Sequence, residues 1–224
     1  MRTDAELRAD VMEEIAWNPE LKSVATEIGV ASKDGVITLS GTVDSYRKKV
    51  WAVEAAQKVS GVKVVASDIG VKLHRSGKAT DTELAQAVRN AVRWNEAVDE
   101  DKVEIKVDDG WVHLSGTVDW LFQKDSAQKS IENLAGVAGV VNSITVKVRE
   151  INAKDIKVKI SAAFHRNASI DASAIQVETT DHKVILHGKV RSWAEKKEAG
   201  DIAGLSPGVV TVENNIDVDT SLLN

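Results

Sequence analysis

Apolar residues four positions apart mark the beginning of each third of the chain. They are Leu7, Val11 and Ile15, then Leu84, Val88 and Val92, then Ile156, Ile160 and Phe164. Residues four apart lie on one face of an α-helix, so each set predicts a helix with a single apolar stripe. Thr3 with Glu6, and Thr80 with Glu83, have the spacing of an N-terminal capping box, and Asn152 supplies a weaker cap in the third case.

Two short alternating runs follow each helix and predict a β-hairpin. In the second third of the chain, residues 103–107 and 112–118 alternate between apolar and polar and are joined through Asp108, Asp109 and Gly110. Alternation around an Asp-Gly pair is typical of a tight hairpin. The first copy has residues 34 and 35 as the same pair. The third has Asp181 and His182, which tolerate positive φ less readily and predict a different turn.

A second helix and a last strand complete each copy. The expected helices cover residues 46–60, 121–135 and 193–205, and the expected strands cover residues 64–73, 140–148 and 209–218. The order is therefore helix, strand, strand, helix, strand. This predicts an α+β fold of three tandem αββαβ modules, each with two helices packed on one face of a three-stranded mixed sheet.

Direct sequence repeats support the same division. Residues 37–43 read Ile-Thr-Leu-Ser-Gly-Thr-Val, residues 112–118 read Val-His-Leu-Ser-Gly-Thr-Val, and residues 184–190 read Val-Ile-Leu-His-Gly-Lys-Val. From the glycine at 41 to that at 116 is 75 residues, and from there to 188 is 72. The Gly-Val pairs at 61, 136 and 208 shift by the same amounts, which excludes a chance match. We expect modules at residues 2–74, 78–149 and 151–223, with a short linker at 75–77 and almost none near 150.

The αββαβ order, the Leu-Ser-Gly-Thr-Val strand and the Gly-Val before the last strand together resemble the BON domain of bacterial osmotic-stress and envelope proteins. An Asn-x-Ile pattern of that family matches at Asn142 and Asn214, whereas the first copy has Ser67 and Asp68 before Ile69. The third copy replaces Ser-Gly-Thr with His-Gly-Lys. The resemblance implies a role in envelope integrity under stress and binding of phospholipid.

Six repeated glycines are expected to be structural. Gly41, Gly116 and Gly188 share a strand face with apolar residues, so the missing side chain would let a helix pack closely on the sheet. The alternative is a backbone exposed to a ligand. Gly61, Gly136 and Gly208 lie where the second helix should end, and a left-handed helix cap explains them.

Composition narrows the function classes. The 224 residues are 43% hydrophobic, which is typical of a globular protein, and the net charge of −5 argues against binding to duplex nucleic acid. There is no cysteine, so no disulfide or thiolate site can form. Charged residues interrupt the first 16 positions, where a signal peptide would be apolar. We therefore expect a cytoplasmic protein, either free or peripheral to the membrane, and the family resemblance implies the periplasm as the alternative. No run approaches the roughly 18 to 20 apolar residues of a membrane span.

The sequence contains no motif that indicates catalysis. The nucleophile, dinucleotide and metalloprotease motifs are absent, and residues 77–80 lack the spacing of a phosphate-binding loop. His182 and His187 are five residues apart, so their side chains should lie on opposite faces of a strand and not share a metal. We therefore expect a binding protein that is not an enzyme and has no cofactor or metal.

Aromatic and basic residues at the start of the second helices are the candidate contact sites. The chain has six tryptophans, and Tyr46, Trp120 and Trp193 all fall at these helix starts. The most apolar start is Trp120, Leu121 and Phe122. Two readings are open: packing between neighbouring modules, or contact with lipid headgroups or a client protein.

Basic residues on the same helices extend this candidate surface. They are Arg47, Lys48, Lys49, Lys196 and Lys197, with Lys154, Lys157 and Lys159 on the first helix of the third copy. They are either ordinary solvated faces or attract anionic phospholipid, which is worth about 1 kcal/mol per basic residue near a charged membrane. The leading prediction is non-catalytic association with an anionic membrane surface during osmotic or envelope stress. The alternative is a protein-interaction scaffold or a holdase-like chaperone, and the oligomeric state is left open.

Overall fold

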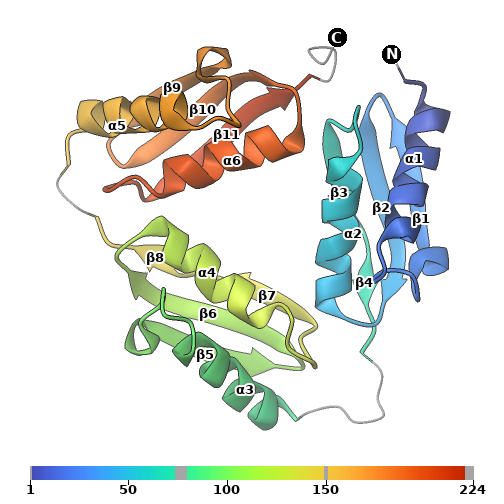
Figure 1. Cartoon of the computed structure of the whole chain (residues 1–224). Coiled ribbons are helices and arrows are strands. Elements are labelled where there is room, and N and C mark those ends of the chain that lie inside the picture. Colours follow the sequence, from blue (N-terminus) through green and yellow to red (C-terminus); the bar gives the residue numbers. More distant parts are fainter. Residues whose placement is uncertain (1, 74–79, 149–150, 220–224) are drawn as a thin grey trace. The chain divides into compact units, whose positions relative to one another are not determined.

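The computed structural model describes residues 2–73, 80–148 and 151–219 (Figure 1). The expected linker at 75–77 and the junction near 150 lie outside these residues. Each of the three modules has two helices on one face of a small mixed sheet, which confirms the predicted α+β repeat (Figure 1).

The elements follow the same order in all three modules. The first contains α1 (Asp4–Trp17), η1 (Ala25–Glu27), β1 (Ile28–Lys33), β2 (Val36–Val43), α2 (Tyr46–Lys58), β3 (Val64–Ser67) and β4 (Gly70–Val71). The second contains α3 (Asp81–Arg93), η2 (Glu100–Lys102), β5 (Val103–Asp108), β6 (Trp111–Val118), α4 (Leu121–Ile131), β7 (Gly139–Asn142) and β8 (Thr145–Val146). The third contains α5 (Ala153–Arg166), η3 (Ala172–Ala174), β9 (Ile175–Thr180), β10 (Lys183–Val190), α6 (Trp193–Gly204) and β11 (Thr211–Val218). The short 3-10 segments before each first strand were not predicted.

The hairpin's second strand lies at the centre of each sheet. In the first module β2 pairs with β1 antiparallel and with β3 and β4 parallel, and in the third β10 lies between β9 and β11 in the same way. A parallel pair requires a crossover connection, and the second helix provides it. The second helix is therefore held against the sheet by the chain's own topology.

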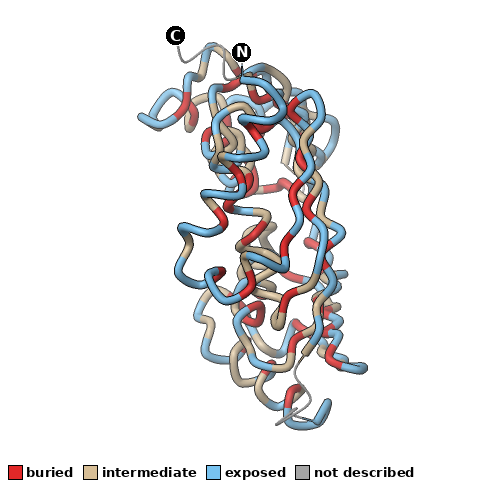
Figure 2. The backbone as a smooth tube through the Cα atoms, turned by 90° about the vertical axis from the view of Figure 1, so that its right-hand side faces the viewer, coloured by how far each residue is buried: buried red, intermediate tan, exposed pale blue. Residues whose placement is uncertain are grey.

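The apolar stripes predicted from the four-residue spacing form the cores. Leu7, Val11 and Ile15 of α1 are buried against Ile37 and Leu39 of β2 and other residues of one cluster. The alternation of buried and exposed residues along the strands and the recurring buried positions on the helices are visible in Figure 2. Burying one such Leu or Ile side chain contributes about 1.5 to 3 kcal/mol. These cores set the rigid frame on which the surface residues stand.

The second helices end earlier than expected, because a turn precedes the last strand. In α2 the helix ends at Lys58, and Val62 N donates to Val59 O at 3.2 Å across a turn in which Gly61 has φ +102°. A hydrogen bond over four residues with positive φ at the third is the pattern of a type II turn. The same bond joins residues 134 and 137, and residues 206 and 209. Gly61, Gly136 and Gly208 thus serve this turn, and not the helix cap that we expected.

Gly41 is structural for a different reason from the one expected. A Cβ on Gly41 would lie 1.9 Å from the carbonyl oxygen of Glu27, and the residue has φ +107°. For Gly116 the same distance, to the carbonyl of Lys102, is 2.1 Å, and for Gly188, to that of Ala174, it is 2.0 Å. The missing side chain makes room for the backbone before the neighbouring strand, not for a helix on the sheet.

The hairpin turns follow the sequence closely. Asp34 and Gly35 have φ +54° and +83°, and Asp109 and Gly110 have φ +45° and +79°, as a type I′ turn requires. Of the two residues in the third hairpin turn only Asp181 has positive φ, and Thr180 still faces Lys183 across a two-residue loop. A different turn was predicted there and is confirmed.

Candidate functional site

One side chain near the start of each second helix ties that helix to the loop after the first helix. Lys48 donates to Ser23 Oγ at 3.0 Å, Gln123 donates to the carbonyl of Ala97 at 2.9 Å, and Glu195 accepts from the backbone N–H of Asp171 at 3.0 Å. The three residues are separated by the repeat offsets, since 123 minus 48 is 75 and 195 minus 123 is 72. The three side chains differ chemically, but each holds the second helix against the loop that follows the first helix. They therefore fix the position of the candidate contact residues on the second helix.

Part of the basic surface on α2 is neutralised locally. Lys48 forms an ion pair of 2.8 Å with Asp44, so it is not available to a distant anion in the same way as a free lysine. The guanidinium carbon of Arg47 lies 5.0 Å from the centre of the Trp51 ring, within the range of a cation–π contact. Lys49 lies beside them on the first turn. The structure brings the three basic residues together on one helix start, next to an aromatic ring.

The start of α6 shows a similar combination. Lys196 Nζ lies 5.0 Å from the ring centre of Trp193. Partial burial lowers the pKa of Lys196, and the charge of Asp217 acts in the opposite direction. Lys197 forms an ion pair of 2.5 Å with Asp201, one helical turn further on. A cation beside an aromatic ring therefore recurs on α2 and α6.

The apolar start of α4 is half-buried. Trp120 precedes the helix, where Ser45 and Ser192 cap the other two second helices, and its backbone N–H donates to Gln123 at 3.0 Å. Its ring centre lies 6.4 Å from that of Phe122 at an angle of 41°. Leu121 is likewise half-buried. The roles predicted for these three residues stay predictions.

The most exposed aromatic residues lie elsewhere, at the ends of the first helices. Trp17 at the end of α1 is 81% exposed, and Trp94, directly after α3, is 80% exposed. Each stands two residues past the last member of the apolar stripe, Ile15 or Val92, and hence off the buried face. We did not predict these sites, although their position relative to the stripe was a usable signal.

The last turns of the two helices that lead to these tryptophans carry opposite charges, and an exposed Glu96 follows Trp94. Arg89 and Arg93, both exposed, lie on the last two turns of α3 before Trp94. Glu13 and Glu14 occupy the last turns of α1 before Trp17. An exposed ring with adjacent cations suits an anionic surface, whereas the same ring with adjacent carboxylates is repelled by one.

The Asn of the Asn-x-Ile pattern has a structural task. Asn142 Nδ2 donates to the carbonyl of Lys124 on α4 at 2.8 Å, and its Oδ1 accepts from the backbone N–H of Ile144 at 3.3 Å. Asn214 makes the equivalent bonds to Lys196 and Ile216. The side chain thus joins the last strand to the second helix. In the first module Ser67 stands at this place, and its buried hydroxyl has no hydrogen-bond partner.

The two histidines of the third hairpin, His182 and His187, do not share a metal site. In the described residues no group of three or more His, Cys, Asp or Glu side chains is placed to hold a metal ion. His182 instead bonds the carbonyl of Gly208 at 3.0 Å, and His187 lies 4.0 Å from Glu178. Across residues 2–73, 80–148 and 151–219, no helix has the length and apolarity needed to cross a bilayer.

The repeated αββαβ unit defines a protein of tandem modules, in which the second helices carry the candidate contact residues. The family model of the BON domain matches the chain three times, at residues 3–72, 80–148 and 152–220. The chain belongs to the BON domain family.

Comparison with individual proteins gives one curated relative. Osmotically-inducible protein Y of Escherichia coli (strain K12) is 31% identical over 148 residues, which is 64% of this chain and 73% of that protein. Among solved structures, CdsD, a structural protein of the type III secretion system of Chlamydia trachomatis, matches with 13% identity and a TM-score of 0.27 over 93% of this chain and 90% of that one. The C-terminal domain of CdsD matches with 12% identity and the same TM-score over 97% of this chain and 100% of that one. Superpositions this weak carry no argument about fold or function.

Proposed function

We propose that this protein is a non-catalytic binding protein that associates reversibly with anionic phospholipid surfaces under osmotic or envelope stress. Membership of the BON family and the similarity to a protein named as osmotically inducible support the stress-related role. The observation that carries the lipid proposal is the exposed Trp94 directly after a helix whose last two turns carry Arg89 and Arg93. Tryptophan is suited to the boundary between water and lipid, and arginines attract anionic headgroups.

The basic starts of α2 and α6 are secondary contacts in this proposal. Arg47 with Trp51, and Lys196 with Trp193, present cations beside aromatic rings, and Lys49 lies on the first turn of α2. The charges of Arg47, Lys48 and Lys197 are already paired with carboxylates, so these three contribute less. The apolar residues 120–122 are a further candidate for insertion.

Vesicle flotation with and without anionic lipid tests the proposal. Trp94→Ala should weaken binding to anionic vesicles about tenfold or more, because a buried aromatic side chain contributes about 1.5 to 3 kcal/mol. Arg93→Gln should weaken it about fivefold, since one basic residue near the membrane is worth about 1 kcal/mol. Vesicles of zwitterionic lipid alone should float without the protein.

Trp17→Ala is the matched control, because Trp17 is as exposed as Trp94 but follows two glutamates. It should leave vesicle binding unchanged within about twofold. Equal losses for both variants would contradict the charge argument. Absence of flotation, together with suppression of aggregation of an unfolding client protein, would favour the holdase alternative.

A further inference from the structure

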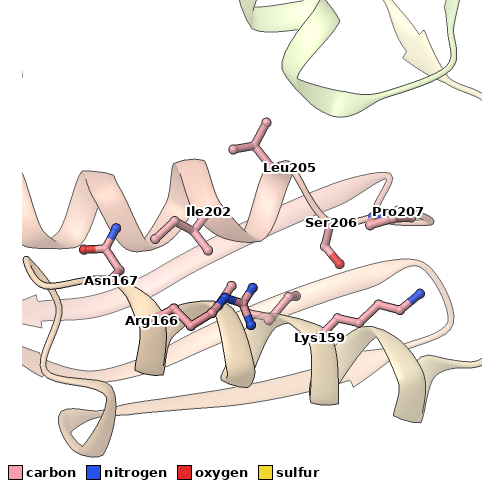
Figure 3. Close-up of a pocket in the computed structure, with 9 residues that line it drawn as sticks. Lys159, Arg166, Asn167, Ile202, Leu205, Ser206 and Pro207 are labelled. Atoms are coloured by element: carbon pink, nitrogen blue, oxygen red, sulfur yellow. The ribbon is translucent and has the colours of Figure 1, made fainter.

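A groove runs between α5 and α6 in the third module, with a volume of about 510 Å³. This is within the roughly 300 to 1,000 Å³ usual for small-molecule sites. Ile160, Ala163, Ile202 and Pro207 supply apolar surface, and Lys159, Arg166 and Ser206 supply polar groups (Figure 3). The groove lies wholly within one module, so its shape depends only on that module's own packing.

Three polar groups of the groove, those of Lys159, Arg166 and Ser206, are hydrogen-bond donors that could bind an acceptor on a ligand. Ser206 is 8% exposed, and its hydroxyl has no hydrogen-bond partner. Among the described residues, neither Lys159 nor Arg166 has a carboxylate within ion-pair distance. Asn167, at one end, is already used, since it accepts from Ser169 N–H at 2.8 Å and donates to Glu198 at 2.8 Å. Burying a hydroxyl without a partner costs about 1 to 3 kcal/mol, which a ligand would recover.

The three donors are specific to the third module. The buried stripe aligns Ile160 with Val88 and Val11, so Lys159 corresponds to Ala87 and Asp10, and Arg166 corresponds to Trp94 and Trp17. The conserved turn aligns Ser206 with Leu134 and Val59. Two cations and one hydroxyl thus replace other residues at three positions, two on α5 and one after α6, that border one groove.

We propose that the α5–α6 groove is a binding site for a phosphate ester that carries a small apolar group. An arginine fork and a hydroxyl can donate to the oxygens of one phosphate, and Lys159, at the other end of the groove (Figure 3), can turn its ammonium toward it. None of the lining residues is a carboxylate, and the Glu198 carboxylate at one end accepts from Asn167. The apolar part lies against Ile160, Ala163 and Ile202. The ligand is either a soluble phosphate ester or the headgroup region of a phospholipid.

Titration of the ¹⁵N-labelled full chain, followed by ¹H–¹⁵N NMR, tests the site. Inorganic phosphate and, separately, dihexanoyl phosphatidic acid should each cause saturable shifts confined to residues 159–167 and 202–208. The lipid ester should bind more tightly than phosphate, because its acyl chains contact the apolar wall of the groove, and equal binding of the two would overturn the apolar part of the proposal. Because both probes are soluble, the result is independent of whether the protein binds vesicles.

Variants identify the donors. Arg166→Gln and Lys159→Gln should each weaken binding about tenfold, as expected for loss of a charge-assisted hydrogen bond, and Ser206→Ala about threefold. Lys157→Gln is the matched control, since it makes the same charge change on an exposed position of α5 that does not line the groove. An unchanged spectrum outside the groove shows that each variant is folded. Shifts that do not saturate, binding of hexanoate as tight as that of phosphate, or an equal loss in Lys157→Gln would overturn the proposal.

Discussion

Gly41, Gly116 and Gly188 stand where the central strand passes directly against a carbonyl oxygen. The clash that a Cβ would make, at 1.9 to 2.1 Å, involves backbone and not a flexible side chain. Removing this clash would therefore require the backbones of the two strands to move apart. The sequence shows that a glycine stands in the strand. It does not show which atom excludes a side chain there, because that carbonyl oxygen belongs to a residue about 14 positions earlier, roughly two strand lengths away.

The first module contains a matched pair of glycines for testing this. Gly41→Ala should destabilise by about 2 kcal/mol or more, because the residue has positive φ and the added carbon meets Glu27 O. Gly70→Ala should be close to neutral, since its Cβ would lie 3.7 Å from the nearest atom, on Thr42. Hydrogen exchange read by mass spectrometry should show faster exchange in residues 28–43 for the first variant alone. Equal protection in both would disprove the clash.

Ser67 offers a prediction in the stabilising direction. Asn142 and Asn214 join strand to helix at the equivalent place, while the Ser67 hydroxyl is buried without a partner. Ser67→Asn should therefore stabilise the first module by about 1 kcal/mol, and Asn142→Ser should cost the second about 1 to 3 kcal/mol. Urea unfolding with exchange-resolved readout measures both. A loss of stability in Ser67→Asn would show that the first module is packed too differently to accept the bond.

At the scale of elements, helix starts were the most predictable feature. Thr80 N–H donates to Glu83 at 2.7 Å while Glu83 N–H donates to Thr80 Oγ1 at 3.2 Å, which is the capping box expected from the spacing, and Thr3 with Glu6 forms another. Asn152 caps α5 through Lys154 N–H at 2.9 Å. Helix ends were less predictable, because the turn at Gly136 begins before the apolar pattern stops.

The capping box of α3 makes the stability of that helix depend on pH. The backbone N–H and then the hydroxyl of Thr80 hold the pKa of Glu83 below its ordinary value of 4.5. Because the folded pKa is lower than the unfolded one, this stabilisation is present above pH 4.5 and is lost as the pH falls through the folded pKa. NMR titration of the Glu83 side-chain carboxyl should give a lower midpoint than in the urea-unfolded chain. Thr80→Ala should bring the two midpoints together.

For the whole molecule, the order and number of elements followed from the repeated periodicity, since each αββαβ unit is specified by local patterns that agree with one another. The candidate site was harder to predict from the sequence than the fold. Trp94 was readable only as a residue off its helix stripe, and its exposure depends on what packs beside it. The groove donors Lys159 and Arg166 lie seven residues apart on α5, and Ser206 follows α6. Only folding shows that α5 and the end of α6 border one groove.

Net charge sets how vesicle binding should respond to salt. At −5 the chain is repelled overall by an anionic bilayer, so attraction must come from local cations such as Arg89 and Arg93. Raising the salt from about 0.1 M, where the screening length is about 10 Å, should therefore weaken flotation progressively. Binding that is indifferent to salt would instead point to apolar insertion around Trp120.

The tie between second helix and loop has a consequence for how three similar copies fold side by side. Tandem repeats risk misassembly in which an element of one copy docks on another. Here Lys48 offers a donor to a hydroxyl, while Glu195 needs a backbone N–H and would face the carboxylate of Asp44 if it took the place of Lys48. Gln123 in turn needs the carbonyl of Ala97. The second helix of the third module therefore mismatches the polar site of the first, which disfavours docking of that helix on the wrong copy during synthesis.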